Sequence, residues 1–226
     1  MKKLLIIFSL LCFVFTSCES EGSDDVNQNT IYTDYELFYD ANGDKTYAIA
    51  TFRFGNALGT PLELSGNNTI TFNGDDLVYN PVTLNHRKEY AGYIAKGDFE
   101  YVNSNGNTFK NTAEFANVIS HPTNIDTITR TGAFTYPFGG GALQAGEIAS
   151  VTIGSDADPL NLEVFINANP GSDNFILPLN QLNQLAIGPS YAQMDRQFEK
   201  PAAEANDDGG IIRTRYRAKN NSVYVK

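Results

Sequence analysis

Two runs with a period of two flank an Asn-Gly pair in the segment YELFYDANGDKTYAIATFRF, residues 35–54. Successive side chains of a β-strand point to opposite faces, so residues two apart share a face. Asn-Gly between two such runs favours a tight hairpin turn. The segment therefore predicts an antiparallel hairpin with one buried face, formed by Tyr35, Leu37, Tyr39, Ala48, Ala50, Phe52 and Phe54.

The rest of the chain repeats this pattern with little sign of helix. Residues 99–115, FEYVNSNGNTFKNTAEF, predict a second hairpin with Asn105-Gly106 at its tip. One helical turn is expected in 180–191, where Leu182 and Leu185 have helical spacing and Gly188-Pro189 ends it. Gly-rich and Asp-rich turns separate the other short runs. Strands are predicted at 61–64, 69–72, 76–82, 89–95, 128–136, 147–153, 160–167, 174–179, 190–198, 210–218 and 222–225.

About seven short strands in each half predict an all-β chain of two tandem sandwiches, residues 30–120 and 121–226. The break is expected near 119–124, where Pro122 interrupts both patterns. A single larger jelly roll or open barrel is the alternative. The leucine-spaced turn before a strand that opens with Tyr191 resembles the E–F corner of immunoglobulin-like and fibronectin III-like sandwiches. That resemblance implies that Tyr191 is a corner tyrosine.

The N-terminus has the layout of a secretory signal. Lys2 and Lys3 precede an apolar run from Leu4 to Val14 that is too short to span a bilayer. Residues 1–17 are therefore predicted to be a signal peptide. The ending Thr16-Ser17-Cys18 resembles the lipobox of bacterial lipoproteins, which implies that Cys18 is the mature N-terminus and carries diacylglycerol and an N-linked acyl chain such as palmitate. The alternative is cleavage by ordinary signal peptidase beside an incidental cysteine.

Charge bears on both anchor and partners. Without residues 1–17 the chain keeps 14 basic and 26 acidic residues, a formal charge of −12. Such a domain repels nucleic acid and anionic lipid, so any membrane attachment has to come from the lipid. Residues 18–29 are predicted to be the lipidated cysteine and a flexible acidic tether.

Two short motifs resemble signals of Bacteroidota-type bacteria. Ser23-Asp24-Asp25 resembles their acidic signal for surface export, which implies an outer-membrane protein displayed on the cell surface; a plain solvated linker is the alternative. Asp126-Thr127-Ile128 resembles their O-glycosylation sequence, which implies a glycan on Thr127.

The segment IIRTRYR, residues 211–217, is the most patterned charged stretch. Alternation puts Arg213, Arg215 and Arg217 on one face of a strand, as a strip for acidic partners or for sulfated or uronic glycans. The simpler interpretation is a solvated sheet face balanced by cross-strand acids such as Asp195 and Glu199. Exposed aromatic residues could stack on sugars, and the candidates are Tyr47, Tyr90 and Tyr93.

No motif predicts an enzyme, a cofactor or a metal site. Asp40, Asn42 and Asp44 have the spacing of a calcium loop, but Lys45 stands where such loops need Gly, and the hairpin accounts for the same residues. His86 and His121 have no cysteine companions and are expected to be isolated loop histidines. The Gly-rich segment 138–146 lacks phosphate-loop spacing and predicts a bend between strands.

Together these features predict a non-catalytic, membrane-anchored surface lipoprotein that serves as a binding, adhesion or spacer module. Residues 30–226 loosely resemble uncharacterised surface lipoproteins of Bacteroidota-type bacteria built from immunoglobulin-like modules. The expected partners are the membrane, through the lipid, and a glycan or an envelope protein. The alternatives are a carbohydrate-binding accessory protein, a component of a surface polysaccharide hydrolase, and a structural part of an envelope assembly. Nothing in the sequence specifies an oligomeric state.

Overall fold

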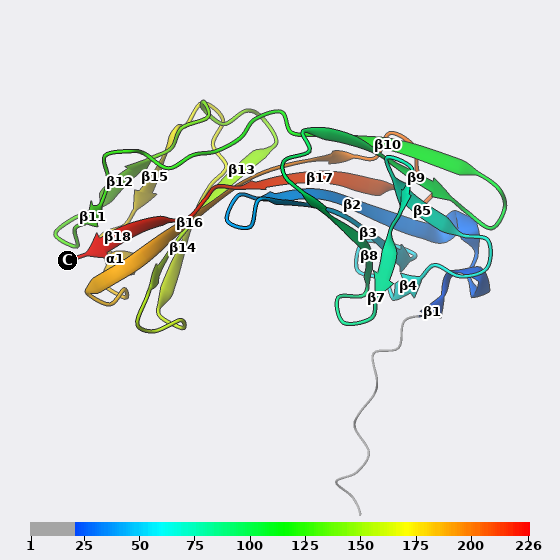
Figure 1. Ribbon diagram of the computed structural model, residues 1–226, viewed down its shortest axis with the longest axis horizontal. Helices are drawn as coiled ribbons and strands as arrows, with labels where there is room; N and C mark the ends of the chain where they lie inside the picture. The colour runs from blue at the N-terminus through cyan, green and yellow to red at the C-terminus, as the bar shows by residue number, and fades with distance from the viewer. Residues whose placement is uncertain (1–20) are drawn as a thin grey trace, which may run out of the picture.

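The computed structural model describes residues 21–226 and is built almost wholly of β-strands (Figure 1). Its only α-helix is α1 (Leu179–Leu182), and two 3-10 turns lie near the N-terminus. The strands of the first half are β1 (Glu21–Gly22), β2 (Ile31–Asp40), β3 (Lys45–Phe54), β4 (Pro61–Glu63), β5 (Thr69–Phe72), β6 (Asp75–Asp76), β7 (Val78–Asn80), β8 (Asn85–Ala91), β9 (Lys96–Val102) and β10 (Thr108–Glu114). Those of the second half are β11 (Thr127–Ile128), β12 (Phe134–Pro137), β13 (Glu147–Ser155), β14 (Leu162–Asn167), β15 (Asn174–Leu177), β16 (Gly188–Pro201), β17 (Gly210–Arg217) and β18 (Asn221–Val225).

One 12-stranded sheet runs through both halves, with the main order β1-β4-β3-β2-β17-β16-β13-β14. β17 pairs parallel with β2 and antiparallel with β16, and Figure 1 shows β16 and β17 reaching from one half to the other. The sheet therefore continues past the break expected at 119–124, and a strand from the end of the chain completes the sheet of the first half. Ile212 of β17 is buried in the core of that half.

Both hydrophobic cores lie on the same face of this sheet, here called the covered face. Cross-strand partners point to the same side, and the register of β13, β16, β17 and β2 carries this face across both halves. A four-stranded sheet, β10-β9-β5-β6, packs on the first core, and the β12-β15 pair with β11 and α1 packs on the second. The opposite face, here called the open face, includes Glu36, Phe38, Arg215, Asp195 and Val164, and within residues 21–226 neither smaller sheet packs on it.

Several local predictions are confirmed. The two Asn-Gly hairpins form as β2–β3 and β9–β10, and the helical turn forms as α1 with Leu182 and Leu185 buried. The expected buried face of the first hairpin is also present, except that Phe54 is 42% exposed. Phe54 is the last residue of β3, and its cross-strand partner Ile31 is fully buried, so alternation alone did not decide the burial of Phe54.

The prediction of a flexible tether over 18–29 is wrong for residues 21–29. β1 pairs parallel with β4, and two 3-10 turns, Ser23–Asp25 and Gln28–Thr30, follow it. Ser23 is fully buried, and its hydroxyl accepts hydrogen bonds from Ser65 N at 2.9 Å and Asn68 Nδ2 at 2.9 Å. These contacts with the first half offset the entropy lost when residues 21–29 become ordered. The polar composition of the segment gave no sign of such contacts. The predicted signal peptide (residues 1–17) and Cys18 lie outside the described residues.

Within residues 21–226, no helix has the length and apolar character needed to cross a membrane.

Candidate functional site

The arginine strip lies on the open face as alternation predicted. Arg213 contacts Glu199 at 3.0 Å and Asp34 at 3.5 Å, and Arg215 Nε donates to Glu36 at 2.8 Å. Arg217 makes two bonds to Asp195, at 2.8 and 2.9 Å. The predicted cross-strand partners Asp195 and Glu199 are therefore confirmed, and Asp34 and Glu36 of β2 are added from the parallel side.

These ion pairs leave the strip charge-balanced. Burial is the largest influence on Asp34 and raises the pKa of that carboxyl, while Arg213 acts in the opposite direction. The hydrogen bond that Arg217 donates to Asp195 is the largest influence on the Arg217 guanidinium and raises its pKa. Because each guanidinium already has a carboxylate partner, an acidic ligand would meet the negative charge of those carboxylates here. The strip alone therefore does not favour a highly charged ligand.

Beside the strip, four planar side chains form a row across β8, β3, β2 and β17. The Arg87 guanidinium lies 5.4 Å from the Tyr47 ring centroid, and the Tyr47 and Phe38 rings stack 5.6 Å apart at 20°. The Arg215 guanidinium then lies 3.8 Å from the Phe38 centroid. Cation–π contacts of this kind fix both the arginines and the rings. We call this set the planar row. Together with Asp40 and Ile49 it lines a cavity of about 230 Å³.

The structure separates the three predicted aromatic candidates. Tyr47 lies in the planar row, next to the arginine strip. Tyr90 instead packs on Phe72, with ring centroids 5.7 Å apart, and burial raises the pKa of its hydroxyl to about 12. Tyr93 is 44% exposed and joins an aromatic cluster that includes Tyr39 and Tyr216, at 5.0 and 5.9 Å. Only Tyr47 therefore shares the open face with the arginines.

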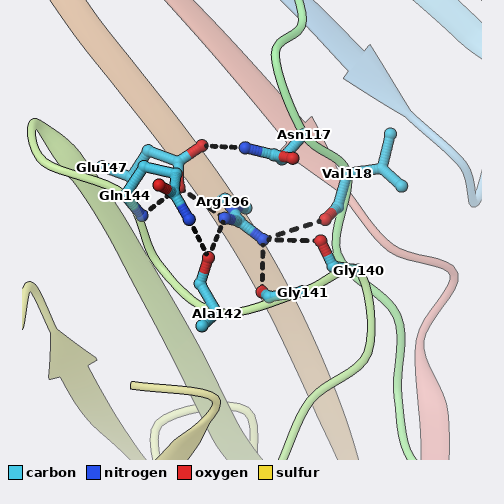
Figure 2. Close-up of polar contacts among 8 residues, drawn as sticks. All are labelled: Asn117, Val118, Gly140, Gly141, Ala142, Gln144, Glu147 and Arg196. Carbon is cyan, nitrogen blue, oxygen red and sulfur yellow. Dashed lines mark hydrogen bonds and ion pairs between the residues drawn. The ribbon is translucent and has the colours of Figure 1, made fainter. Parts of the chain in front are cut away.

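The junction of the two halves contains a buried ion pair between Arg196 and Glu147, which the sequence analysis missed (Figure 2). Their side chains are 1% and 3% exposed. Arg196 also donates to the carbonyls of Val118 at 3.3 Å and Gly140 at 3.1 Å, and it bonds those of Gly141 and Ala142. One side chain thus ties the connection between the halves to the Gly-rich loop.

Glu147 has three donors of its own. Burial alone would raise its pKa, but hydrogen bonds from Arg196, from Asn117 and from the backbone N–H of Gln144 outweigh burial and lower it. The carboxylate therefore stays ionised and matches the buried guanidinium. A signal for this pair existed in the sequence, because Arg196 continues the buried phase of Ala192 and Met194 along β16. A charged side chain on the buried side of a strand needs a partner of opposite charge or hydrogen-bonding groups.

The Gly-rich segment 138–146 forms the predicted bend, between β12 and β13. Gly140 has φ +99°, and a Cβ there would lie 2.1 Å from the carbonyl oxygen of Val118. Glycine is needed at this position because only a residue without a Cβ brings the loop close enough for its carbonyls to reach Arg196. The bend is thus a structural part of the junction.

The prediction of a loop histidine is wrong for His86, which is buried on β8 because it continues the covered side of that strand, whereas His121 lies outside the strands as expected. Burial lowers the pKa of both His86 and His121 to about 4. His86 Nε2 accepts from the Leu64 N–H at 3.3 Å, and His121 Nδ1 lies 2.9 Å from the Tyr136 hydroxyl. Within residues 21–226, no group of three or more His, Cys, Asp or Glu is placed to hold a metal ion.

Other predicted positions have ordinary structural roles. Asp40 Oδ1 accepts from Asn42, and Asp44 accepts from Tyr39 at 2.9 Å, so two oxygens of the calcium-like spacing are engaged within the hairpin. Thr127 lies on β11 and is partly buried opposite Tyr224. Tyr191, expected as a corner tyrosine, places its ring over Gly154 of β13, where a Cβ would approach it to 2.4 Å.

No family model and no curated protein matches the chain. Among solved structures, it is similar to a chain described in "Structural insight into host cell surface retention of a 1.5-MDa bacterial ice-binding adhesin", with 10% identity, a TM-score of 0.22, and coverage of 88% of this chain and 66% of that one. A second is described as "Crystal structure of tetra-tandem repeat in extending region of large adhesion protein", with 11% identity, a TM-score of 0.23, and coverage of 84% and 49%. The chain thus spans less than two thirds of either, and at such TM-scores the likeness carries no argument about function.

Proposed function

We propose that this protein is a non-catalytic binding module that holds a glycan chain on its open face and is attached to the bacterial surface by a lipid on Cys18. The observation that carries the proposal is the planar row, which lines a cavity of about 230 Å³ on the open face. Within residues 21–226 neither smaller sheet covers this face in either half, so it is long enough for an extended ligand.

The chemistry of the open face suits a sugar better than a polyanion. Tyr47 and Phe38 offer apolar ring surface, while the paired arginines and carboxylates offer donors and acceptors for hydroxyl groups. Only Nε of Arg215 bonds Glu36, so its terminal amino groups remain available as donors. A neutral glycan can use these groups without breaking the ion pairs. We therefore expect modest affinity for a glycan, from ring stacking and hydrogen bonds to its hydroxyl groups.

The anchor in this proposal is short. Glu21 is already paired with Leu62 of β4, so three peptide steps separate Cys18 from the folded structure. Three residues extend about 10 Å at most. A lipid on Cys18 would therefore hold the first half close to the membrane, with its position limited by β1.

A glycan array probed with the purified chain tests the binding proposal. Tyr47→Ala removes a ring of the planar row and should weaken binding to any positive glycan by about tenfold or more, as for loss of one stacking platform. Tyr93→Ala is the matched control, because Tyr93 is 44% exposed but packs beside Tyr39 and Tyr216, away from the open face. Binding that is unaffected by Tyr47→Ala, or silence on every glycan, would contradict the proposal and leave a spacer role.

The anchor is tested separately, by mass spectrometry of the mature N-terminus together with protease shaving of intact cells. A diacylglycerol-modified Cys18 and loss of the protein on shaving are expected. An unmodified Cys18 would refute the lipid anchor, and resistance to protease would refute surface display.

A further inference from the structure

Among residues 21–226, no strand pairs with the outer edge of β14, which ends the 12-stranded sheet (Figure 1). The Ser155 N–H donates to the Asn161 carbonyl at 2.9 Å, which fixes the hydrogen-bonding phase of the β13–β14 pair. In an antiparallel pair, residues alternate between bonding the neighbour and facing away from it. The N–H and C=O groups of Leu162, Val164 and Ile166 therefore point to the free edge.

The same three residues also present apolar side chains to solvent. Leu162 is 41% exposed, Val164 45% and Ile166 70%, and Ile148 of the adjacent β13 adds another 42%-exposed side chain on the open face. Natural sheets protect long edges with charges, prolines, bulges or covering loops. The one charged residue of β14, Glu163, lies on the covered face.

Four other sheet edges within residues 21–226, on β1, β7, β10 and β12, do have such protection. β1 has 2 residues and β7 has 3, which leaves little edge to pair. On β10, the Lys110 N–H donates to the Glu204 carboxylate at 2.6 Å, and the Asn111 side chain bonds the Glu204 carbonyl. β12 ends in Pro137. β14 therefore differs from these edges in being both long and unprotected.

We propose that β14 pairs antiparallel with β14 of a second copy of this chain, around a two-fold axis through Val164. This register places Val164 opposite Val164 of the second copy and Leu162 opposite Ile166. All three positions point their backbone groups at the partner, which gives two hydrogen bonds in each of three residue pairs. A register centred on Glu163 would keep two such pairs and set the two Glu163 carboxylates opposite each other, and one centred on Phe165 would also keep only two pairs within β14.

A second copy suits the edge because the segment Leu-Glu-Val-Phe-Ile-Asn is self-complementary in this register. On the open face, apolar side chains meet apolar side chains. On the covered face, Glu163 lies opposite Phe165 of the second copy, so the two carboxylates do not face each other. Two copies of a chain with 26 acidic and 16 basic residues already repel each other, so this register avoids adding a further repulsion between carboxylates. The pairing would also join two open faces into one surface, a property beyond the proposed glycan binding and independent of it.

The contact is small compared with a standard protein interface, so we expect a weak, concentration-dependent dimer. Sedimentation velocity of the full chain measures the fraction of dimer at each concentration. If the chain carries a lipid, all samples are measured in the same detergent. Val164→Lys puts a charge on the edge and should raise the dimer Kd by about tenfold or more. Val82→Lys is the matched control, because Val82 is 88% exposed and lies outside the strands. Both positions are exposed, so both variants should fold.

Cysteine substitutions test the register. Val164→Cys should give a disulfide-linked dimer under mild oxidation, because paired Cα atoms in this register lie about 5.5 Å apart. Leu162→Cys and Ile166→Cys should not cross-link alone but should do so when mixed. The unsubstituted chain controls for Cys12 and Cys18. The proposal is overturned if the chain is monomeric at every concentration, if Val164→Lys dimerises like the parent, or if Leu162→Cys alone cross-links as well as Val164→Cys.

Discussion

The two halves share one sheet and cover the same face of it, yet they differ on both of its faces. The first core is aromatic: Tyr35, Phe52, Phe72, Phe99 and Tyr101 are fully buried, and several of their rings lie about 5 Å apart. The second core is mainly aliphatic, built from residues such as Ile128, Val151, Ile153, Leu177 and Val225.

The open face shows the opposite division. In the first half it carries arginines paired with carboxylates and the planar row, whereas at β14 it carries exposed Leu162, Val164 and Ile166. In the polar part, the arginines are paired with carboxylates. At the edge of β14, the outward-facing backbone N–H and C=O groups have no strand partner within residues 21–226. The comparison teaches that one continuous sheet can present two kinds of surface, one suited to a ligand and one suited to another strand.

Truncating each core gives the largest expected effect and shows whether the halves fold as one unit. Phe99→Ala should cost about 3–5 kcal/mol and Ile153→Ala about 2–5 kcal/mol, because each leaves a cavity at a fully buried site. Since β17 hydrogen-bonds to both halves, both variants should shift a single urea-unfolding transition, followed by tyrosine fluorescence. Two transitions, each sensitive to only one variant, would show that the halves unfold independently.

Glu147→Gln should cost about 3–5 kcal/mol, because it leaves the buried charge of Arg196 without a counter-ion. Asp195→Asn, which breaks the more exposed pair with Arg217, should cost about 1 kcal/mol or less. Urea unfolding at neutral pH compares the two. Glu147 has a lowered pKa, so its contribution is present above the unfolded value of about 4.3 and is lost as pH falls. Equal costs for the two variants would contradict a special role for the junction.

Gly140→Ala should destabilise the junction by about 3 kcal/mol, because the new Cβ would both strain a positive φ and clash with the Val118 carbonyl. Gly141→Ala is the control: its φ is +85°, but no atom lies within 4 Å of the added Cβ, so about 1 kcal/mol is expected. Thermal unfolding of both variants measures the difference. Similar losses would mean that backbone strain, and not close contact with Val118, decides the cost.

Each half also holds one histidine whose pKa is lowered by burial, which makes stability depend on pH. With folded pKa values of about 4 and unfolded values near 6.5, the unfolded chain binds more protons in between, so stability falls as pH is lowered through this window. From pH 6.5 to 5 the loss should be about 2 kcal/mol for His86 and less for the more exposed His121. His86→Gln should flatten this slope more than His121→Gln. An unchanged slope in His86→Gln would contradict neutral burial of His86.

Sequence reasoning reached the features that depend on near neighbours. Asn42-Gly43 and Asn105-Gly106 predicted their hairpins because turn geometry is a local property, and alternation placed Arg213, Arg215 and Arg217 on one face with Asp195 and Glu199 as partners. It did not separate Tyr47 from Tyr90 and Tyr93, because the face of a strand that is covered depends on distant segments.

What the sequence determined by itself is the all-β character and the positions of the hairpins, since side-chain alternation and turn preferences act over a few residues. Only the tertiary structure decided that β17 joins β2, that Arg196 meets Glu147 across 49 positions, and that residues 21–29 fold onto the first half. Those contacts join segments far apart in the chain. Their free energy comes from burial and pairing in three dimensions, which no short stretch of sequence specifies.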